Sequence, residues 1–72
     1  PKKTMKLRYV GDTFWPGDGL TNGKVYEAWL DPDSGMYRVI DDSGEDYLYS
    51  PDAPGPADGS VPNGRWEIAE EE

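Results

Sequence analysis

The sequence contains no cysteine and no histidine. The first absence excludes disulfide bonds and thiolate nucleophiles, and the second removes the usual base of nucleophilic catalysis. Together they also remove the ligands that structural zinc sites use most. A 72-residue chain without such crosslinks depends on packing for its stability. We therefore expect a non-enzymatic protein with no cofactor.

Positive charge is also scarce. Seven Lys and Arg residues oppose fifteen Asp and Glu residues, which gives a net charge of −8. Four of the seven basic residues are Lys2, Lys3, Lys6 and Arg8, so the rest of the chain is strongly acidic. Because an acidic body repels nucleic-acid phosphates and anionic lipid, we expect neither a nucleic-acid nor a membrane partner.

Long hydrophobic runs are missing as well. No apolar segment approaches the roughly 20 residues that a membrane-spanning helix needs, and no secretory hydrophobic region precedes the first predicted strand. These observations favour a cytoplasmic location. Since 72 residues enclose only one compact core, we expect a single domain that is a monomer or a weak dimer.

Aromatic residues and turn-forming residues dominate what is present. Short runs of β-branched and aromatic residues alternate with clusters of Gly, Pro, Asn and Asp, a pattern typical of short strands joined by turns. The first run shows the two-residue period of a half-buried strand, with Leu7 and Tyr9 alternating with Lys6 and Arg8. The pattern predicts five strands, at residues 5–10, 24–30, 36–40, 45–49 and 65–69.

Turns and long loops separate these strands. Residues 31–35 and 41–44 are predicted to form tight hairpin turns, because both runs place Asp early and Gly late. Residues 11–23 form a long first loop. Residues 50–64 contain four prolines among glycines and small polar residues, and they cannot form a ladder strand.

This order of elements indicates an all-β fold, a small five-stranded Src-homology-3-like barrel. Closure into a barrel removes the exposed sheet edges that so short a chain cannot otherwise cover. The barrel domain is predicted to span residues 5–69. It is flanked by a basic arm at residues 1–4 and an acidic tail at residues 70–72, which we expect to be disordered.

Two segments also carry a family resemblance. Residues 20–27 (LTNGKVYE) and 37–49 (YRVIDDSGEDYLY) resemble small uncharacterised domains found in bacterial genomes and their prophages. Those domains look like stand-alone Src-homology-3-like barrels, so the resemblance implies this fold and no assigned activity. It covers residues 5–49 and 65–70. The chain departs from the family between residues 50 and 64, where the family has a shorter connection that ends in an aromatic residue.

Carboxylates concentrate in the two predicted turns, as Asp31-x-Asp33-x-Gly35 and Asp41-Asp42-x-x-Glu45-Asp46. Such oxygen ligands suit calcium, but Gly35 and Asp42 stand where the calcium-loop template requires an acid or amide and a Glu. Turn chemistry accounts for the same residues, and a weak cation site is the alternative. Paired carboxylates also serve glycosidases, but a barrel of this size has little volume for a sugar-binding cleft.

Candidate binding residues lie mainly in the first long loop. Phe14 and Trp15 are two large rings among Asp and Gly residues, and they either cap the barrel or are exposed for a partner. Aromatic rings beside acids are what polyproline-binding grooves present, although the Ala-Leu-Tyr-Asp-Tyr run and the paired Trp of such grooves are absent. We predict a protein-interaction domain with an unidentified protein partner. Its predicted partner-binding residues are Phe14, Trp15, Asp12, Asp18 and Trp29.

The acidic charge suggests an alternative function. An accessory or inhibitory protein that mimics nucleic-acid charge would bind a basic partner through its acidic surface. A surface that only keeps the domain soluble has the same charge. Salt dependence separates these alternatives, because charge-driven binding weakens steeply with ionic strength and binding in an aromatic groove persists.

Overall fold

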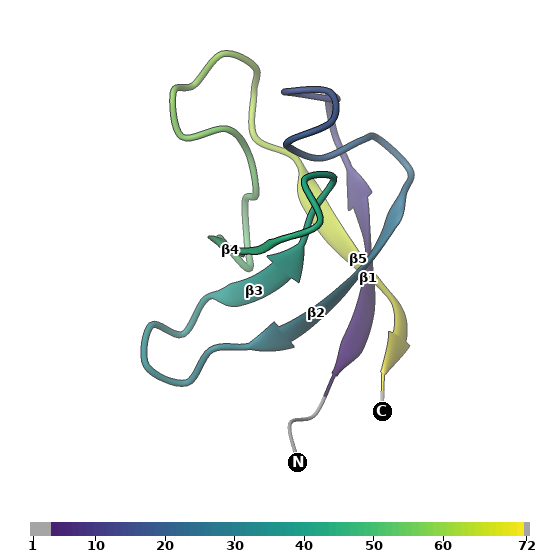
Figure 1. Ribbon diagram of the computed structural model, residues 1–72, viewed down its shortest axis with the longest axis vertical. Helices are drawn as coiled ribbons and strands as arrows, with labels where there is room; N and C mark the ends of the chain where they lie inside the picture. The colour runs from purple at the N-terminus through teal and green to yellow at the C-terminus, as the bar shows by residue number, and fades with distance from the viewer. Residues whose placement is uncertain (1–3, 72) are drawn as a thin grey trace.

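The computed structural model describes residues 4–71 of the chain. Residues 1–3 of the predicted basic arm and residue 72 of the predicted tail lie outside this range. The described strands form one antiparallel sheet in the order β4-β3-β2-β1-β5 (Figure 1). The strands are β1 (Met5–Val10), β2 (Val25–Leu30), β3 (Tyr37–Ile40), β4 (Asp46–Tyr49) and β5 (Arg65–Glu71). The predicted all-β class is confirmed, and every strand begins within one residue of its predicted start.

The C-terminal strand is longer than the sequence pattern predicted. β5 continues through Glu70 and Glu71, where the charge pattern predicted a disordered tail. The edge of β1 explains this difference, because Glu70 pairs with Lys6 and Glu71 pairs with Met5 after a register shift. Backbone pairing does not depend on apolar side chains, and the Lys6–Glu70 pair places opposite charges across the ladder.

The sheet is not closed. In the described part of the chain its ladder ends at β4 on one side and at β5 on the other. Side chains connect the two edges instead, since the Trp66 indole N–H donates a hydrogen bond to the Ser50 carbonyl oxygen at 3.0 Å. The Trp66 ring also packs edge-on against the Tyr49 ring, with 6.3 Å between ring centroids. The predicted closure into a barrel is not confirmed by these strand pairings.

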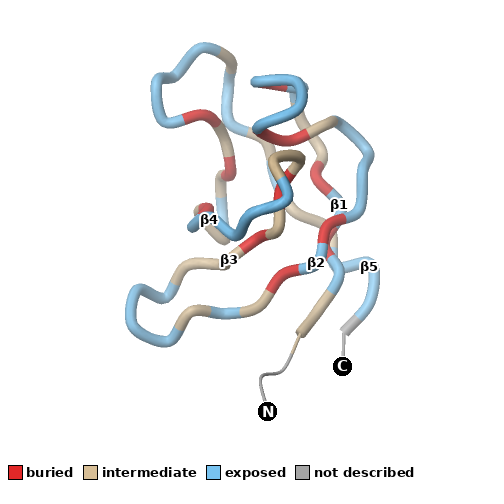
Figure 2. Tube along the Cα trace, viewed as in Figure 1, coloured by how far each residue is buried: buried red, intermediate tan, exposed pale blue. Residues whose placement is uncertain are grey.

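The core consists of aromatic and aliphatic side chains from β1 to β4 and from the β1–β2 loop (residues 11–24). Figure 2 shows buried segments on the strands and on parts of both long loops, whereas the β2–β3 turn is exposed. Because each buried ring removes about 150–250 Å² from water, a few aromatics supply much of this small core. The buried hydrophobic residues are Leu7, Tyr9, Phe14, Leu20, Tyr26, Ala28, Val39 and Tyr49.

The β1–β2 loop contributes two side chains to the core, although most of its residues are exposed. Phe14 and Leu20 are both buried, and the Phe14 N–H donates to the Leu20 carbonyl oxygen at 3.1 Å. Gly19 lies directly against Phe14, so a Cβ at position 19 would approach the Phe14 carbonyl oxygen to 2.5 Å. The close approach requires glycine at this position. The loop is therefore fixed at its base by two anchor residues.

We predict that Leu20→Ala lowers the free energy of unfolding by about 2–5 kcal/mol, because it leaves a cavity where the loop enters the core. Leu30→Ala is the matched control, since Leu30 is 53% exposed. The control should change the free energy by less than about 1 kcal/mol. Denaturant unfolding of both variants measures the difference, and equal losses would contradict the placement of the loop.

Candidate functional site

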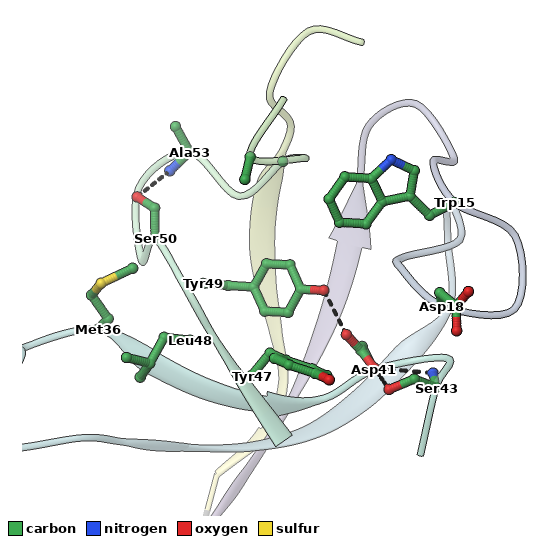
Figure 3. Close-up of a pocket in the computed structure, with 12 residues that line it drawn as sticks. Trp15, Asp18, Met36, Asp41, Ser43, Tyr47, Leu48, Tyr49, Ser50 and Ala53 are labelled. Atoms are coloured by element: carbon green, nitrogen blue, oxygen red, sulfur yellow. Dashed lines mark hydrogen bonds between the residues drawn. The ribbon is translucent and has the colours of Figure 1, made fainter. Parts of the chain in front are cut away.

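A cavity of about 590 Å³ lies beside β4, between three segments of the chain (Figure 3). These segments are the β1–β2 loop, the β3–β4 hairpin and the β4–β5 loop (residues 50–64). The two long loops extend from the same end of the sheet (Figure 1). The lining residues are Trp15, Asp18, Met36, Asp41, Ser43, Tyr47, Leu48, Tyr49, Ser50, Ala53, Gly55 and Ala57.

The open edge of the sheet exposes Tyr47 to the cavity. Ala28, Val39 and Tyr47 are in register across β2, β3 and β4, so they share the inner face of the sheet. Ala28 and Val39 are fully buried, whereas Tyr47 is 51% exposed. Tyr47 lies on the edge strand β4 and has a neighbouring strand on one side only, whereas Tyr49 on the same face is covered by the Trp66 ring of β5. Tyr47 therefore lines the cavity, although the alternation along β4 places it on the core-facing side of the sheet.

Trp15 stands across the cavity from Tyr47 and Tyr49 (Figure 3). Its φ of 47° lies in the left-handed region, which a bulky side chain rarely adopts. Hydrogen bonds hold this conformation, because the Trp15 carbonyl oxygen accepts the N–H groups of Asp18 and Gly19, both at 2.7 Å. The ring packs edge-on against Phe14 and is 41% exposed. A strained backbone that presents a large ring to solvent is typical of a functional position.

The β4–β5 loop carries a carboxyl, Asp58, whose pKa is lowered by neighbouring donors. Hydrogen bonds from the Ser60 backbone, from the Ser60 hydroxyl and from the Trp15 side chain lower the pKa of the Asp58 carboxyl. The distance between the Ser60 nitrogen and the Asp58 oxygen is 2.9 Å. The indole itself packs edge-on against the Phe14 ring.

Asp41 is a buried carboxylate at the end of β3, with 5% of its surface exposed. It accepts hydrogen bonds from the Tyr49 hydroxyl at 2.7 Å, from the Ser43 N–H at 3.0 Å and from the Ser43 hydroxyl. Burial raises the pKa of Tyr49 far above its ordinary value, and the hydrogen bond to Asp41 raises it further. Tyr49 is therefore a neutral donor that lies between Asp41 and the core.

Asp42 binds the β1–β2 loop and β2. Its carboxylate accepts hydrogen bonds from Lys24 Nζ at 2.8 Å, Thr21 Oγ1 at 2.8 Å and the Tyr26 hydroxyl at 2.9 Å. Its backbone N–H donates to the Gly19 carbonyl oxygen at 2.9 Å. Burial by itself raises the pKa of Asp42, but the hydrogen bonds from these three side chains outweigh it, and the pKa lies below its ordinary value. Burial, together with Asp42, raises the pKa of Tyr26 to about 12.

The structure brings together two of the five predicted binding residues, since Trp15 and Asp18 both line the cavity. Phe14 is 3% exposed, and its burial removes it from the predicted contact set. The sequence allows Phe14 either to cap the barrel or to be exposed for a partner, and the structure shows that the Phe14 ring caps the core. Asp12 is exposed on the same loop but does not line the cavity. Trp29 lies on the opposite face of β2 from the buried Ala28, away from the cavity lining.

Most of the cavity wall lies outside the five predicted partner-binding residues. The alternation in residues 45–49 predicts that Tyr47 and Tyr49 share one strand face, where they could extend an aromatic surface. Nothing in the sequence indicates that β4 is an edge strand beside a cavity. The Ser43 and Asp41 side chains were interpreted as turn residues, and they do form the turn. The signal that was available is the alternation of Tyr47 and Tyr49 directly after an acidic turn.

The turn carboxylates act as hydrogen-bond acceptors within the described residues. Asp31 accepts the Ser34 N–H at 3.1 Å and the Ser34 hydroxyl at 2.7 Å, as turn chemistry predicts. Over residues 4–71, no group of three or more His, Cys, Asp and Glu side chains is arranged to hold a metal ion. The same part of the chain has no helix that is long and apolar enough to cross a membrane.

Comparison of the chain with protein-family models, curated proteins and solved structures gives no match. The geometry and chemistry of the cavity are therefore the basis for assigning a function.

We predict that Asp41→Ala lowers the free energy of unfolding by about 1–3 kcal/mol, because it leaves the buried Tyr49 hydroxyl without its acceptor. Asp33→Ala is the matched control in an exposed turn, and it should change stability by no more than about 0.5 kcal/mol. Thermal or denaturant unfolding measures both variants. A loss no larger than that of the control would show that the buried carboxylate does not stabilise the hairpin.

The lowered pKa of Asp42 predicts a loss of stability in acid. The ordinary value is 3.8 and the folded value is lower, so the stabilisation is present above pH 3.8 and is lost as the pH falls through the folded value. Unfolding at a series of pH values should therefore show a smaller acid dependence in Asp42→Asn than in the parent protein. An identical acid dependence would contradict the assigned hydrogen bonds.

Proposed function

We propose that the protein is a small, non-enzymatic protein-interaction module of Src-homology-3-like architecture, and that the cavity beside β4 is its docking groove. The strand order supports this architecture, because β5 returns to pair with β1 after a meander of β1 to β4. A long first loop, two tight hairpin turns and a late return strand also suit the Src-homology-3-like arrangement. In this proposal the Trp66 contacts to Ser50 and Tyr49 take the place of strand pairing at the barrel seam.

The observation that carries the proposal is the presentation of Trp15 over the cavity. Trp and Tyr are the residues most enriched at binding hot spots, because they bury a large rigid surface at low entropic cost. Here Trp15 and Tyr47 are both about half exposed on facing sides of one cavity. The volume of about 590 Å³ falls within the range of about 300–1,000 Å³ typical of ligand sites. The aliphatic Leu48 and Met36 extend the apolar lining.

Binding is favoured over catalysis by the state of the polar groups in the cavity. Asp41, Ser43 and Tyr49 hydrogen bond to one another, and each group is engaged in holding the hairpin. A general base requires a carboxylate that is within reach of a substrate proton and able to accept it. The buried oxygens of Asp41 already accept three hydrogen bonds. The arrangement therefore supports a rigid wall rather than a reacting group.

A charge-driven function is the second candidate, and the ion pairs favour it. The charged groups of Lys24, Arg8, Arg38 and Arg65 each lie within 4 Å of an Asp or Glu oxygen, at distances of 2.8, 3.8, 3.4 and 3.0 Å. Each of these basic groups is paired with a carboxylate. The electrostatic field around the protein is therefore determined by the acidic groups that have no basic partner. A partner that binds this field would be basic, and its affinity would fall steeply with salt.

A peptide-display selection followed by nuclear magnetic resonance tests the groove. Peptides selected on the folded protein should shift the signals of Trp15 and Tyr47. Trp15→Ala should weaken their binding at least tenfold, since hot-spot truncations cost about 2 kcal/mol or more. Trp29→Ala is the matched control, because Trp29 is a partly exposed indole outside the cavity. It should change the affinity less than about twofold.

Two results would overturn the groove. Selected peptides that shift only residues outside the cavity would place the binding surface elsewhere. Binding that disappears at high salt and is unaffected by Trp15→Ala would identify the charge-driven function instead.

A further inference from the structure

Asp41 and Asp42 are adjacent carboxylates with different charge compensation. Asp42 is paired with the Lys24 ammonium group at 2.8 Å. The hydrogen-bond donors to Asp41 among the described residues are Ser43 and Tyr49, and all of them are neutral. A buried charge is costly unless an opposite charge accompanies it. Asp41 is thus a buried negative charge without a resident cation, and it forms part of the cavity wall.

Two further carboxylates add negative charge at the same end of the cavity. Asp18 is exposed and lines the cavity, and Glu45 accepts a hydrogen bond from the Tyr47 hydroxyl at 3.2 Å. Glu45 and its hydrogen bond raise the pKa of Tyr47, and Asp41 and Asp18 raise it further. The twelve lining residues include no lysine or arginine. The ligand that complements this end of the cavity is therefore a cation.

The rest of the cavity restricts the shape of that cation. The rings of Trp15, Tyr47 and Tyr49 surround the space next to the carboxylates (Figure 3). Aromatic faces attract cations, and Trp attracts them most strongly. A guanidinium group is planar, stacks on aromatic rings, binds carboxylates through two parallel hydrogen bonds and is less strongly hydrated than an ammonium group. Its aliphatic stem suits the apolar surface of Leu48 and Met36.

We propose that the groove selects a protein segment by an arginine side chain, which enters between Trp15 and Tyr47 and places its guanidinium beside Asp18 at the Asp41 end. This inference rests on the proposed docking function and adds the chemistry of the ligand. Asp18 makes the direct contact, because it is exposed. Asp41 contributes the buried charge, and Trp15 covers the guanidinium.

Three capped tripeptides of the form acetyl-Ala-X-Ala-amide test the proposal, with X as arginine, citrulline or lysine. Citrulline has nearly the same shape as arginine and carries no charge. Each tripeptide is titrated into the full chain while the Trp15 indole and Tyr47 ring signals are followed by nuclear magnetic resonance. The arginine peptide should shift both signals, with an affinity at least tenfold higher than that of the citrulline peptide. Lysine should bind more weakly than arginine.

Matched variants test the assigned residues. Asp18→Asn and Asp33→Asn both replace an exposed Asp and change the net charge equally, but only Asp18 lines the cavity. Asp18→Asn should weaken binding of the arginine peptide at least threefold, and Asp33→Asn should leave it unchanged. If the two variants weaken binding equally, the arginine peptide is attracted by the net charge of the protein and not by Asp18, and the proposed site is wrong.

The outcomes also separate this inference from the proposed function. Display-selected peptides that bind at Trp15 while arginine, citrulline and lysine tripeptides are equivalent would overturn the arginine preference and leave the groove in place. If neither the selected peptides nor the arginine tripeptide shifts Trp15 and Tyr47, both proposals fail. An arginine tripeptide that shifts only signals outside the cavity would overturn the arginine site.

Discussion

The adjacent carboxylates at the end of β3 are the constraint on which the rest of the structure depends. Asp41 holds Tyr49 and closes the hairpin turn through Ser43. Asp42 faces the other way and holds the β1–β2 loop through Thr21 and Lys24. Because neighbouring residues extend in opposite directions, one dipeptide connects the edge strand, the core and the β1–β2 loop. Both carboxylates are largely buried, and every buried polar side-chain atom in the described residues has a hydrogen-bond partner.

The cavity follows from this constraint and from the open sheet. The loop that Asp42 holds carries Trp15, and the edge strand that Asp41 holds carries the half-exposed Tyr47. The backbone behind two walls of the cavity is therefore held by hydrogen bonds, and in the proposed function this lowers the entropic cost of binding. The same geometry leaves Asp41 beside the cavity without a cation. A single arrangement thus accounts for the stability of the hairpin, the shape of the groove and the charge of the proposed ligand.

The sequence predicted local structure better than long-range structure. The strands followed from alternation, as in Leu7 and Tyr9, and the turns followed from Asp and Gly positions, because both signals depend on near neighbours. The extension of β5 through Glu70 was missed, since it depends on the edge of β1 and not on its own side chains. Trp15 and Asp18 were found from local composition. Local alternation predicts that Tyr47 and Tyr49 share one face, whereas the position of Tyr47 on an edge strand beside the cavity depends on the strand order, which no local pattern encodes.

Amide hydrogen exchange measures most directly whether Asp42 holds the β1–β2 loop. The Phe14 N–H is bonded to Leu20 and the Thr21 N–H to the Tyr26 hydroxyl, so both amides lie in the part of the loop that Asp42 fixes. In Asp42→Asn we predict faster exchange at these two amides, with unchanged exchange in the β1–β2 ladder. Unchanged exchange at Phe14 and Thr21 would contradict it, because the loop would then be ordered without the carboxylate.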